Sequence, residues 1–287
     1  MKFMADVTLL IPCRCTLGEN PLWDEAKRIF YWTDIDRGEV HEWFEVTGQT
    51  RRMYRGPKVG GFTLEADGSL ALFRETDIAR LEGDGSCTQT IPFSDEGAER
   101  FNDVTADPRG RVFAGTIGRS ATSGGVFRFD HDGNGRLLFR GTGVSNGMGF
   151  SPDLRTFYWT CSTTKRIFAF DYDVDSGEIS HRRLVHEAPP TAGIPDGLCM
   201  DTAGGFWSAR WDGSRIVHHQ ADGTVDGEIP IPTLRPTSCC FGGPKLDQLF
   251  VTSARGSDEP AGSPAGGVFR VTGAGQGRPV RRSHLFC

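Results

Sequence analysis

The sequence has no run that approaches the ~20 apolar residues of a membrane-spanning helix, and helical periodicity is nearly absent from it. It has no concentrated basic face either, because acidic residues outnumber basic ones and the formal net charge is −5. Surfaces that bind nucleic acid or anionic membranes need such a face. We therefore expect a protein that binds neither nucleic acid nor a membrane.

Several common kinds of active-site chemistry are missing as well. The eight cysteines include no CxxC pair of the zinc or redox type, and the seven histidines share no common spacing. An even number of cysteines permits disulfides, but a chain of 287 residues does not need them. The N-terminal letters MKFMADVTLLIPCRC are weak as a signal peptide. We expect reduced thiols in a cytoplasmic protein.

Strand and turn signals, in contrast, recur along the whole chain. Its 38 glycines and 16 prolines are spread out, which is typical of many short elements joined by turns. A turn followed by a short apolar strand appears six times, as AKRIFYWTDI, DGSLALFRET, RGRVFAGTI, LRTFYWTCS, AGGFWSARW and LDQLFVTSAR. The first core residues of these copies are 40 to 49 positions apart, at Phe30, Leu70, Val112, Phe157, Phe206 and Leu249.

This period predicts an all-β fold, a six-bladed β-propeller. The six copies account for most of the chain, so residues 1–287 are expected to form one domain without linkers. A β-sandwich with similar strand content is the alternative, but it does not explain the regular period. The apolar segment 7–12 precedes the first copy, and its pairing with the last blade would close the ring and remove an exposed edge.

Polar residues stand at a nearly constant distance before four of the six repeat markers. Four of them lie 10 or 11 positions ahead, namely Glu19, Asn102, Asn146 and Asp196, whereas the other two copies have GG and SC there. Equivalent positions of successive blades converge on the central channel, so these side chains should meet. Asx residues beside glycine are also ordinary turn formers. The shared offset in four blades favours a site over turns.

Two carboxylates and two carboxamides form an oxygen-rich site suited to one divalent metal cation. This donor set does not choose among calcium, manganese, magnesium, iron(II) and zinc. Gly197 follows Asp196 directly, and we expect it to let the backbone bend close to the metal.

The motifs LGENPLW, RFNDV, VSNGMGFSPD, IPDGLCMD and TSCCFGG, with the terminal AGGVFRVTG, resemble the regucalcin (senescence marker protein), gluconolactonase and luciferin-regenerating-enzyme-like family. The resemblance extends from about Cys13 to Gly273, with all motifs in the family's order. It implies a six-bladed propeller with a central metal site, held by Glu19, Asn146 and Asp196. It also implies hydrolysis of a sugar lactone, similar to gluconolactone or xylonolactone, to the aldonic acid in sugar catabolism.

The same resemblance assigns Arg100 and Asn102 to substrate binding and makes Asp196 the proton donor and acceptor. In animal members a glutamate after the AGT strand touches the sugar, and here AGTIGRS places Ser120 there, beside Arg119. This departure affects the preferred sugar but leaves the metal ligands in place. A carboxylate bound to a dication is a weak base, so Asp196 could instead serve mainly as a ligand that orients water.

Two other functions stay open at this point. A propeller of this type could hydrolyse other lactones or organophosphates, and a calcium-binding propeller without turnover would carry the same ligands. Polar residues confined to the channel favour an enzyme. We expect a small sugar lactone as its partner, and a monomer or weak dimer.

Overall fold

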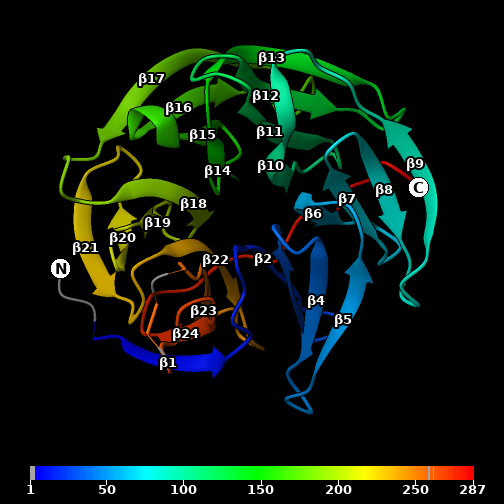
Figure 1. Ribbon diagram of the computed structural model, residues 1–287. Coiled ribbons are helices and arrows are strands. Elements are labelled where there is room, and N and C mark those ends of the chain that lie inside the picture. The colour runs from blue at the N-terminus through cyan, green and yellow to red at the C-terminus, as the bar shows by residue number, and fades with distance from the viewer. Residues whose placement is uncertain (1–3, 258, 261) are drawn as a thin grey trace.

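The computed structural model describes residues 4–257, 259–260 and 262–287. Six four-stranded antiparallel sheets surround a central axis, as Figure 1 shows, which confirms the predicted six-bladed propeller. The only helical element in these ranges is the short 3-10 helix η1 (Ser162–Thr164). None of the described segments forms a helix long and apolar enough to cross a membrane.

The first three blades follow one another in chain order, each with its innermost strand first. Blade 1 contains β2 (Gly18–Asp24), β3 (Ile29–Asp34), β4 (Glu39–Phe44) and β5 (Thr50–Arg55). Blade 2 contains β6 (Val59–Leu64), β7 (Leu70–Arg74), β8 (Asp77–Leu81) and β9 (Cys87–Pro92). Blade 3 contains β10 (Ala98–Ala106), β11 (Val112–Gly118), β12 (Gly124–Phe129) and β13 (Gly135–Thr142).

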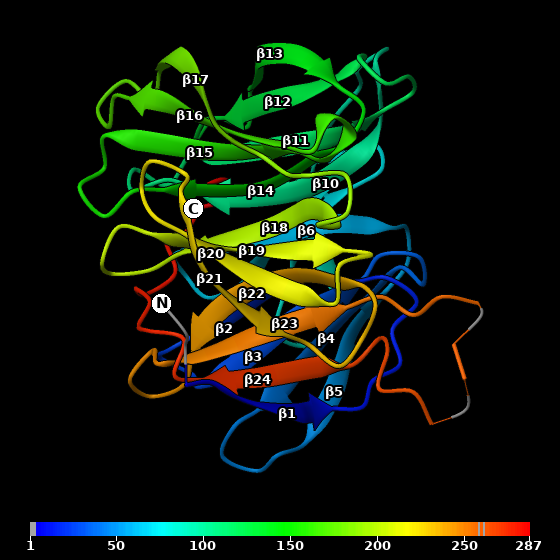
Figure 2. The ribbon, with the colours of Figure 1, turned by 90° about the vertical axis from the view of Figure 1, so that its left-hand side faces the viewer.

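The next two blades repeat this order, and the sixth combines both ends of the chain. Blade 4 contains β14 (Ser145–Phe150), β15 (Thr156–Cys161), β16 (Arg166–Tyr172) and β17 (Ile179–Glu187). Blade 5 contains β18 (Ile194–Met200), β19 (Phe206–Trp211), β20 (Arg215–His219) and β21 (Val225–Pro230). Blade 6 contains β22 (Pro236–Gly242), β23 (Gln248–Ser253), β24 (Val268–Thr272) and, as its outermost strand, β1 (Asp6–Ile11). The antiparallel pairing of β1 with β24 appears at the bottom of Figure 2.

The turns between the first two strands of a blade have a common chemistry. Short polar side chains stabilise tight turns by accepting hydrogen bonds from nearby backbone N–H groups. In five blades this turn contains an aspartate that does so, namely Asp24, Asp67, Asp107, Asp153 and Asp201. In these five blades the aspartate therefore fixes the turn that follows the inner strand.

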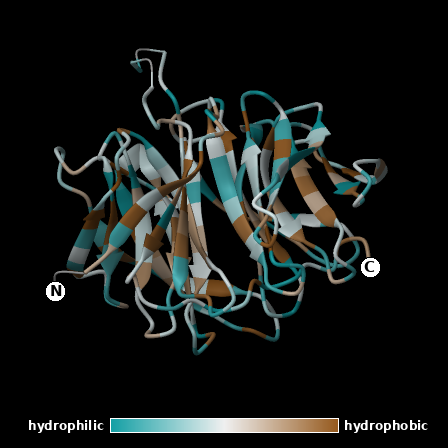
Figure 3. Ribbon diagram, turned by 90° about the horizontal axis from the view of Figure 1, so that it is seen from below, coloured by the Kyte–Doolittle hydropathy of each residue, from teal (hydrophilic) through white to brown (hydrophobic). Residues whose placement is uncertain are grey.

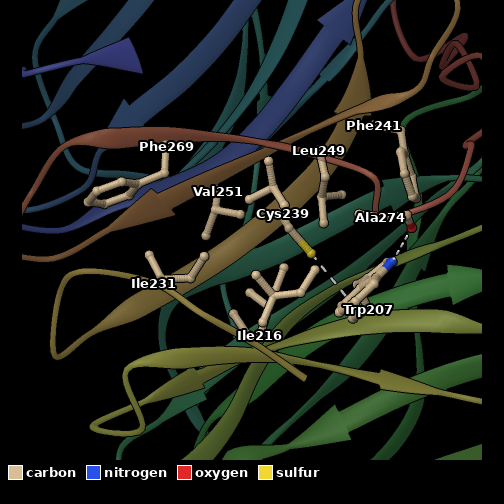
Figure 4. Close-up of a cluster of buried hydrophobic side chains, with 12 residues drawn as sticks. Trp207, Ile216, Ile231, Cys239, Phe241, Leu249, Val251, Phe269 and Ala274 are labelled. Carbon is tan, nitrogen blue, oxygen red and sulfur yellow. Dashed lines mark hydrogen bonds between the residues drawn. The ribbon is translucent and has the colours of Figure 1, made fainter. Parts of the chain in front are cut away.

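The core lies between neighbouring blades rather than in a single centre. Middle strands are covered on both faces, so β3 (IFYWTD) is buried at every position, whereas the outer strand β9 is largely exposed. Figure 3 shows the resulting bands of apolar and polar residues along the strands. Figure 4 shows one interblade cluster, where Trp207 and Ile216 of blade 5 contact Leu249 and Val251 of blade 6.

The C-terminal tail, residues 274–287, crosses the end of the channel to which the inner strands run. Its hydrogen bonds reach one residue in or beside the first turn of every blade: Asp24, Leu64, Gly110, Pro152, Thr202 and Leu246. The carboxylate of Glu65, which is fully buried, accepts the backbone N–H of Phe286 at 3.0 Å. The tail thereby ties all six blades together, a feature that the repeat did not predict.

Candidate functional site

The inner strands share a local irregularity at the level of the predicted site. In each blade the pairing register between the first and second strands shifts near the start of the inner strand, as at Glu19, Asn146 and Pro195. A β-bulge of this kind bends the strand and re-aims its side chains. Asn20 lies in the bulge of β2 and takes a left-handed φ of 48°. Six bulges in a ring bring the same position of each blade toward the channel.

The four residues picked out by the shared offset are all buried at this level. Glu19 lies on β2, Asn102 on β10, Asn146 on β14 and Asp196 on β18, and none is more than 6% exposed. The Asn102 Nδ2 donates to Asn146 Oδ1 at 2.7 Å, so two neighbouring blades meet directly through these side chains. The predicted convergence is therefore present in the fold.

A chain of hydrogen bonds links these residues across three blades. The Arg100 Nη1 donates to Asn102 Oδ1 at 2.8 Å, and Asn102 in turn donates to Asn146. The Asn146 Nδ2 donates to Ser162 Oγ at 2.9 Å, and Ser162 donates to the carbonyl of Pro195 at 2.6 Å. Pro195 directly precedes Asp196. These hydrogen bonds therefore fix the side-chain amides of Asn102 and Asn146 relative to Asp196.

The carboxylates of the site are held in an environment that disfavours their negative charge. Burial, together with the charges of Asp196 and Asp103, raises the pKa of Glu19 well above its ordinary value. Burial and the charge of Asp103 likewise raise the pKa of Asp196, although the Gly197 N–H and the Asn146 side chain partly offset this. Burial raises the pKa of Asp103 itself to about 7. Three acids near one another without enough counter-charge require protons or a cation.

The same residues fit a divalent cation. The Glu19 Oε2 and Asp196 Oδ1 atoms are buried and have no hydrogen-bond partner among the described residues. Buried polar atoms without partners are rare and call for an unseen ligand or ion. No cluster of three or more His, Cys, Asp or Glu in the described ranges forms a metal site by itself, so a cation here would need the Asn146 oxygen as well. Such a mixed oxygen set suits hard divalent cations.

Glycines let the inner strands approach closely enough to form this ring. A Cβ on Gly147 would lie 2.6 Å from the carbonyl oxygen of Asp196, and a Cβ on Gly197 would lie 2.0 Å from Ser238 Oγ. Neither glycine has a positive φ. Gly197 thus makes room for the inner strand of the next blade, and its expected role in bending the backbone toward a metal stays a prediction.

Ser120 lies apart from this network. It is exposed in the turn after β11, and its backbone N–H donates to Ser123 Oγ at 2.9 Å. No hydrogen bond joins its side chain to another described residue. The neighbouring Arg119 is also exposed. The structure thus brings Glu19, Asn102, Asn146 and Asp196 together, with Arg100 beside them, but leaves Ser120 at the rim.

The channel continues below the site into a cavity of about 190 Å³. The residues that line it include the polar Asp103 and Asn20, the apolar Met148 and Leu198, and Arg281 of the tail. The guanidinium of Arg281 lies 5.5 Å from the ring of Phe150. The tail therefore covers the end of the channel that lies away from Arg100.

The sequence patterns did not identify two residues that belong to the candidate site. Asp103 follows Asn102 directly and adds a third carboxylate to the site, and the RFND motif itself was the available signal. Ser162 comes from η1, and its role depends on where blades 4 and 5 meet. No local pattern in TCSTT marks it, so only the fold identifies it.

Comparisons with known proteins agree with this architecture. The family model described as "SMP-30/Gluconolactonase/LRE-like region" matches residues 17–255, and the chain therefore belongs to that family, as its motifs predicted. Pentonolactonase XacC of Haloferax volcanii is 39% identical over 287 residues, which cover 97% of this chain and 98% of that protein.

Two further comparisons extend the likeness to an animal protein and a solved structure. Human regucalcin is 31% identical over 284 residues, covering 94% of this chain and 95% of regucalcin. The solved structure of luciferin-regenerating enzyme superposes with a TM-score of 0.90 at 26% identity, covering 98% of this chain and all of that one. Both span almost the entire chain, so the whole propeller is shared.

Proposed function

We propose that this protein hydrolyses a small sugar lactone to the aldonic acid in its central channel, with the help of one divalent cation. Family membership and the 39% identity to a pentonolactonase make it a lactonase, a hydrolase, as the sequence predicted. The observation that carries the mechanism is the pair of buried carboxylate oxygens of Glu19 and Asp196, which have no hydrogen-bond partner in the described part of the chain, near the Arg100–Asn102 pair.

Glu19, Asn146 and Asp196 would hold the cation, since they provide two charged oxygens and one amide oxygen. Among the residues that the structure describes, only Asn102 donates to Asn146 Oδ1, so a lone pair stays free for a metal. When bound, a divalent cation supplies polarisation of a carbonyl oxygen and favours ionisation of water. The donor set is compatible with calcium, magnesium, manganese, iron(II) or zinc.

Arg100 and Asn102 would bind and orient the lactone. Arg100 uses Nη1 to hold Asn102 and the Phe101 carbonyl, at 2.8 and 2.7 Å, so its other N–H groups can reach substrate oxygens. A fixed guanidinium in a site poor in bulk water stabilises the negative charge that develops on the lactone oxygen. Burial lowers the pKa of Arg100, while the charge of Glu19 favours its protonated form.

Asp196 would orient the attacking water and handle its proton. Its Oδ1 is buried and no described residue hydrogen-bonds to it, while the Gly197 N–H helps to fix the carboxylate. The carboxylate would take a proton from water as the C–O bond forms and return it to the ring oxygen as the lactone bond breaks. Ser162 would act through positioning, because its bonds hold the Asn146 side chain and the backbone that carries Asp196.

The preferred sugar is expected to differ from that of the animal relatives. By the resemblance to the animal members, Ser120 occupies the position at which they have a glutamate. A serine cannot accept hydrogen bonds from two sugar hydroxyls as a carboxylate can. The neighbouring Arg119 is exposed and favours a strongly polar or anionic substituent. Pentonolactones are the first choice, because the relative with 39% identity is a pentonolactonase.

The decisive experiment is acid release in a pH-stat from five- and six-carbon aldonolactones, with and without EDTA. We expect hydrolysis of at least one pentonolactone, loss of the rate in EDTA, and recovery on adding a divalent cation. Turnover that is unaffected by EDTA after dialysis would refute the metal part. A calcium-binding protein that turned over none of the lactones would refute the enzymatic part.

A further inference from the structure

Arg210 is a buried cation that the proposed mechanism does not use. It lies on β19 of blade 5, and its side chain is 1% exposed. Its Nη1 donates to Ser208 Oγ at 2.9 Å, and its Nη2 donates to His219 Nε2 at 2.8 Å. The His219 Nδ1 donates to the Gly223 carbonyl at 3.0 Å, which leaves Nε2 of a neutral imidazole as the acceptor. Both side-chain partners of the guanidinium are therefore uncharged.

The other arginines that are nearly as buried have carboxylates beside them. Arg111 and Arg128 are each 7% exposed. The Arg111 Nε lies 2.5 Å from the Asp107 carboxylate, and the Arg128 Nε lies 2.9 Å from that of Asp130. A buried charge normally has an opposite charge or an ion beside it, because its removal from water is costly. Within the described ranges, the hydrogen bonds of Arg210 go to neutral groups only.

The Arg210 guanidinium also has donors to spare. A guanidinium carries five N–H groups, and Ser208 and His219 take up only two of them. The Nε atom is buried and has no hydrogen-bond partner among the described residues. Burial and the nearby Arg215 cation lower the pKa of Arg210 to about 9, so the group remains charged at neutral pH. Arg210 thus presents a full positive charge and an unused donor inside the protein.

The facing wall of blade 4 contributes a hydroxyl group. The rings of Tyr158 on β15 and Phe206 on β19 are 5.0 Å apart, so these two strands face each other between blades 4 and 5. Side chains two positions apart on a strand share a face, which puts Thr160 on one wall and Ser208 with Arg210 on the other. Thr160 is fully buried, and its Oγ1 has no hydrogen-bond partner in the part of the chain that the structure describes.

We propose that the interface between blades 4 and 5 binds one small monovalent inorganic anion, with chloride as the ligand, through the Arg210 guanidinium and the Thr160 hydroxyl. A halide ion accepts hydrogen bonds from both groups and neutralises the buried charge, and hydrogen bonds to an ion are the stronger kind. A water molecule would accept the same hydrogen bonds but would leave the charge of Arg210 uncompensated. The complete burial of both side chains favours a monatomic ion over an organic acid.

The first test is crystallographic and uses the parent protein. Crystals grown without chloride are soaked in sodium bromide, because bromide replaces chloride and scatters X-rays anomalously. We expect an anomalous peak between blades 4 and 5, at hydrogen-bond distance from Arg210 Nε. A peak without anomalous signal at that position, as a water molecule gives, would overturn the proposal, and so would the absence of any peak.

The second test measures unfolding while chloride replaces methanesulfonate at constant ionic strength. The ratio of folded to unfolded parent protein should rise in proportion to 1 + [Cl⁻]/Kd, hence about tenfold for each tenfold increase well above Kd. Arg210→Met removes the buried charge and should abolish this dependence. Arg136→Met removes an exposed cation that pairs with Glu178 and should retain it. An equal response to chloride in all three proteins, or none in the parent, would overturn the proposal.

Thr160→Val provides a milder perturbation of the same site. It preserves the shape of the side chain but removes the hydroxyl, so the Kd for chloride should rise about 10-fold, the scale of one hydrogen bond to a charged group. An unchanged Kd would overturn the assignment of Thr160 as a ligand. If Arg210→Met did not fold, the bromide crystals and the Thr160→Val titration would still decide whether the anion binds.

Discussion

Replacement of Asp196 by Asn is the most direct perturbation of the proposed mechanism. The substitution preserves the size of a side chain that is 4% exposed and retains one oxygen, but it removes the negative charge. Burial and the charge of Asp196 are the two largest causes of the raised pKa of Glu19. Loss of one of them should let Glu19 ionise at a lower pH, so metal affinity should fall less than the lost charge alone would suggest.

The size of the effect on turnover separates the two roles that Asp196 could have. If Asp196 only anchors the cation, saturating metal should restore most of kcat. If it also handles the proton, kcat should stay about 10²–10⁴-fold lower at saturating metal, which corresponds to about 3–5 kcal/mol in the activation barrier. Asp196 Oδ1 has no hydrogen-bond partner among the described residues and is available for either role, so this assay decides between them.

Initial rates of acid release over a range of metal concentrations would measure this. Glu19→Gln is the matched control, because Glu19 is buried to the same degree and binds the same proposed cation but is given no proton to transfer. Added metal should rescue it largely. Near-normal activity of Asp196→Asn without extra metal would refute the site assignment, and with it the mechanism.

Three further predictions follow from other parts of the structure. Ser162→Ala should remove the hydrogen bonds of Ser162 to Asn146 Nδ2 and to the Pro195 carbonyl, destabilise the fold by about 1–3 kcal/mol in denaturant titrations and weaken metal binding about 10–100-fold; an unchanged metal affinity would contradict its positioning role. Deletion of residues 274–287 should lower the free energy of unfolding by at least about 3 kcal/mol, because it exposes buried Leu285 and breaks bonds to every blade; a truncated protein that unfolds like the parent would show that the tail is dispensable. Burial opposes protonation of His218, but hydrogen bonds to Asp201 and Asp226 raise its pKa overall. That stabilisation is complete below about pH 6.5 and lost as the pH rises through the raised pKa. The difference in free energy of unfolding between the parent and His218→Gln should therefore be larger at pH 5.5 than at pH 9. An equal difference at both pH values would refute the pairing of His218 with the two aspartates.

The sequence by itself determined the fold and which polar residues lie buried on the inner strands. The repeat fixed six blades, since strand and turn signals are local and recur wherever a blade begins. The common offset of Glu19, Asn102, Asn146 and Asp196 identified the buried ring because each blade places its first strand toward the same axis. Because the blades repeat around one axis, residues at the same offset in each sequence repeat lie close together in the structure.

Only the tertiary structure decided which groups contact one another across blades. Ser162 joins Asn146 to the strand of Asp196 through two hydrogen bonds between elements distant in sequence. The tail binds all six blades and has no repeat to mark it. Gly197 turned out to accommodate Ser238 of the next blade, and Ser120 lies at the rim because a turn can point in several directions. Contacts between blades depend on the distance and rotation between neighbouring sheets, and these are set by the packing of the whole ring, which no local pattern encodes.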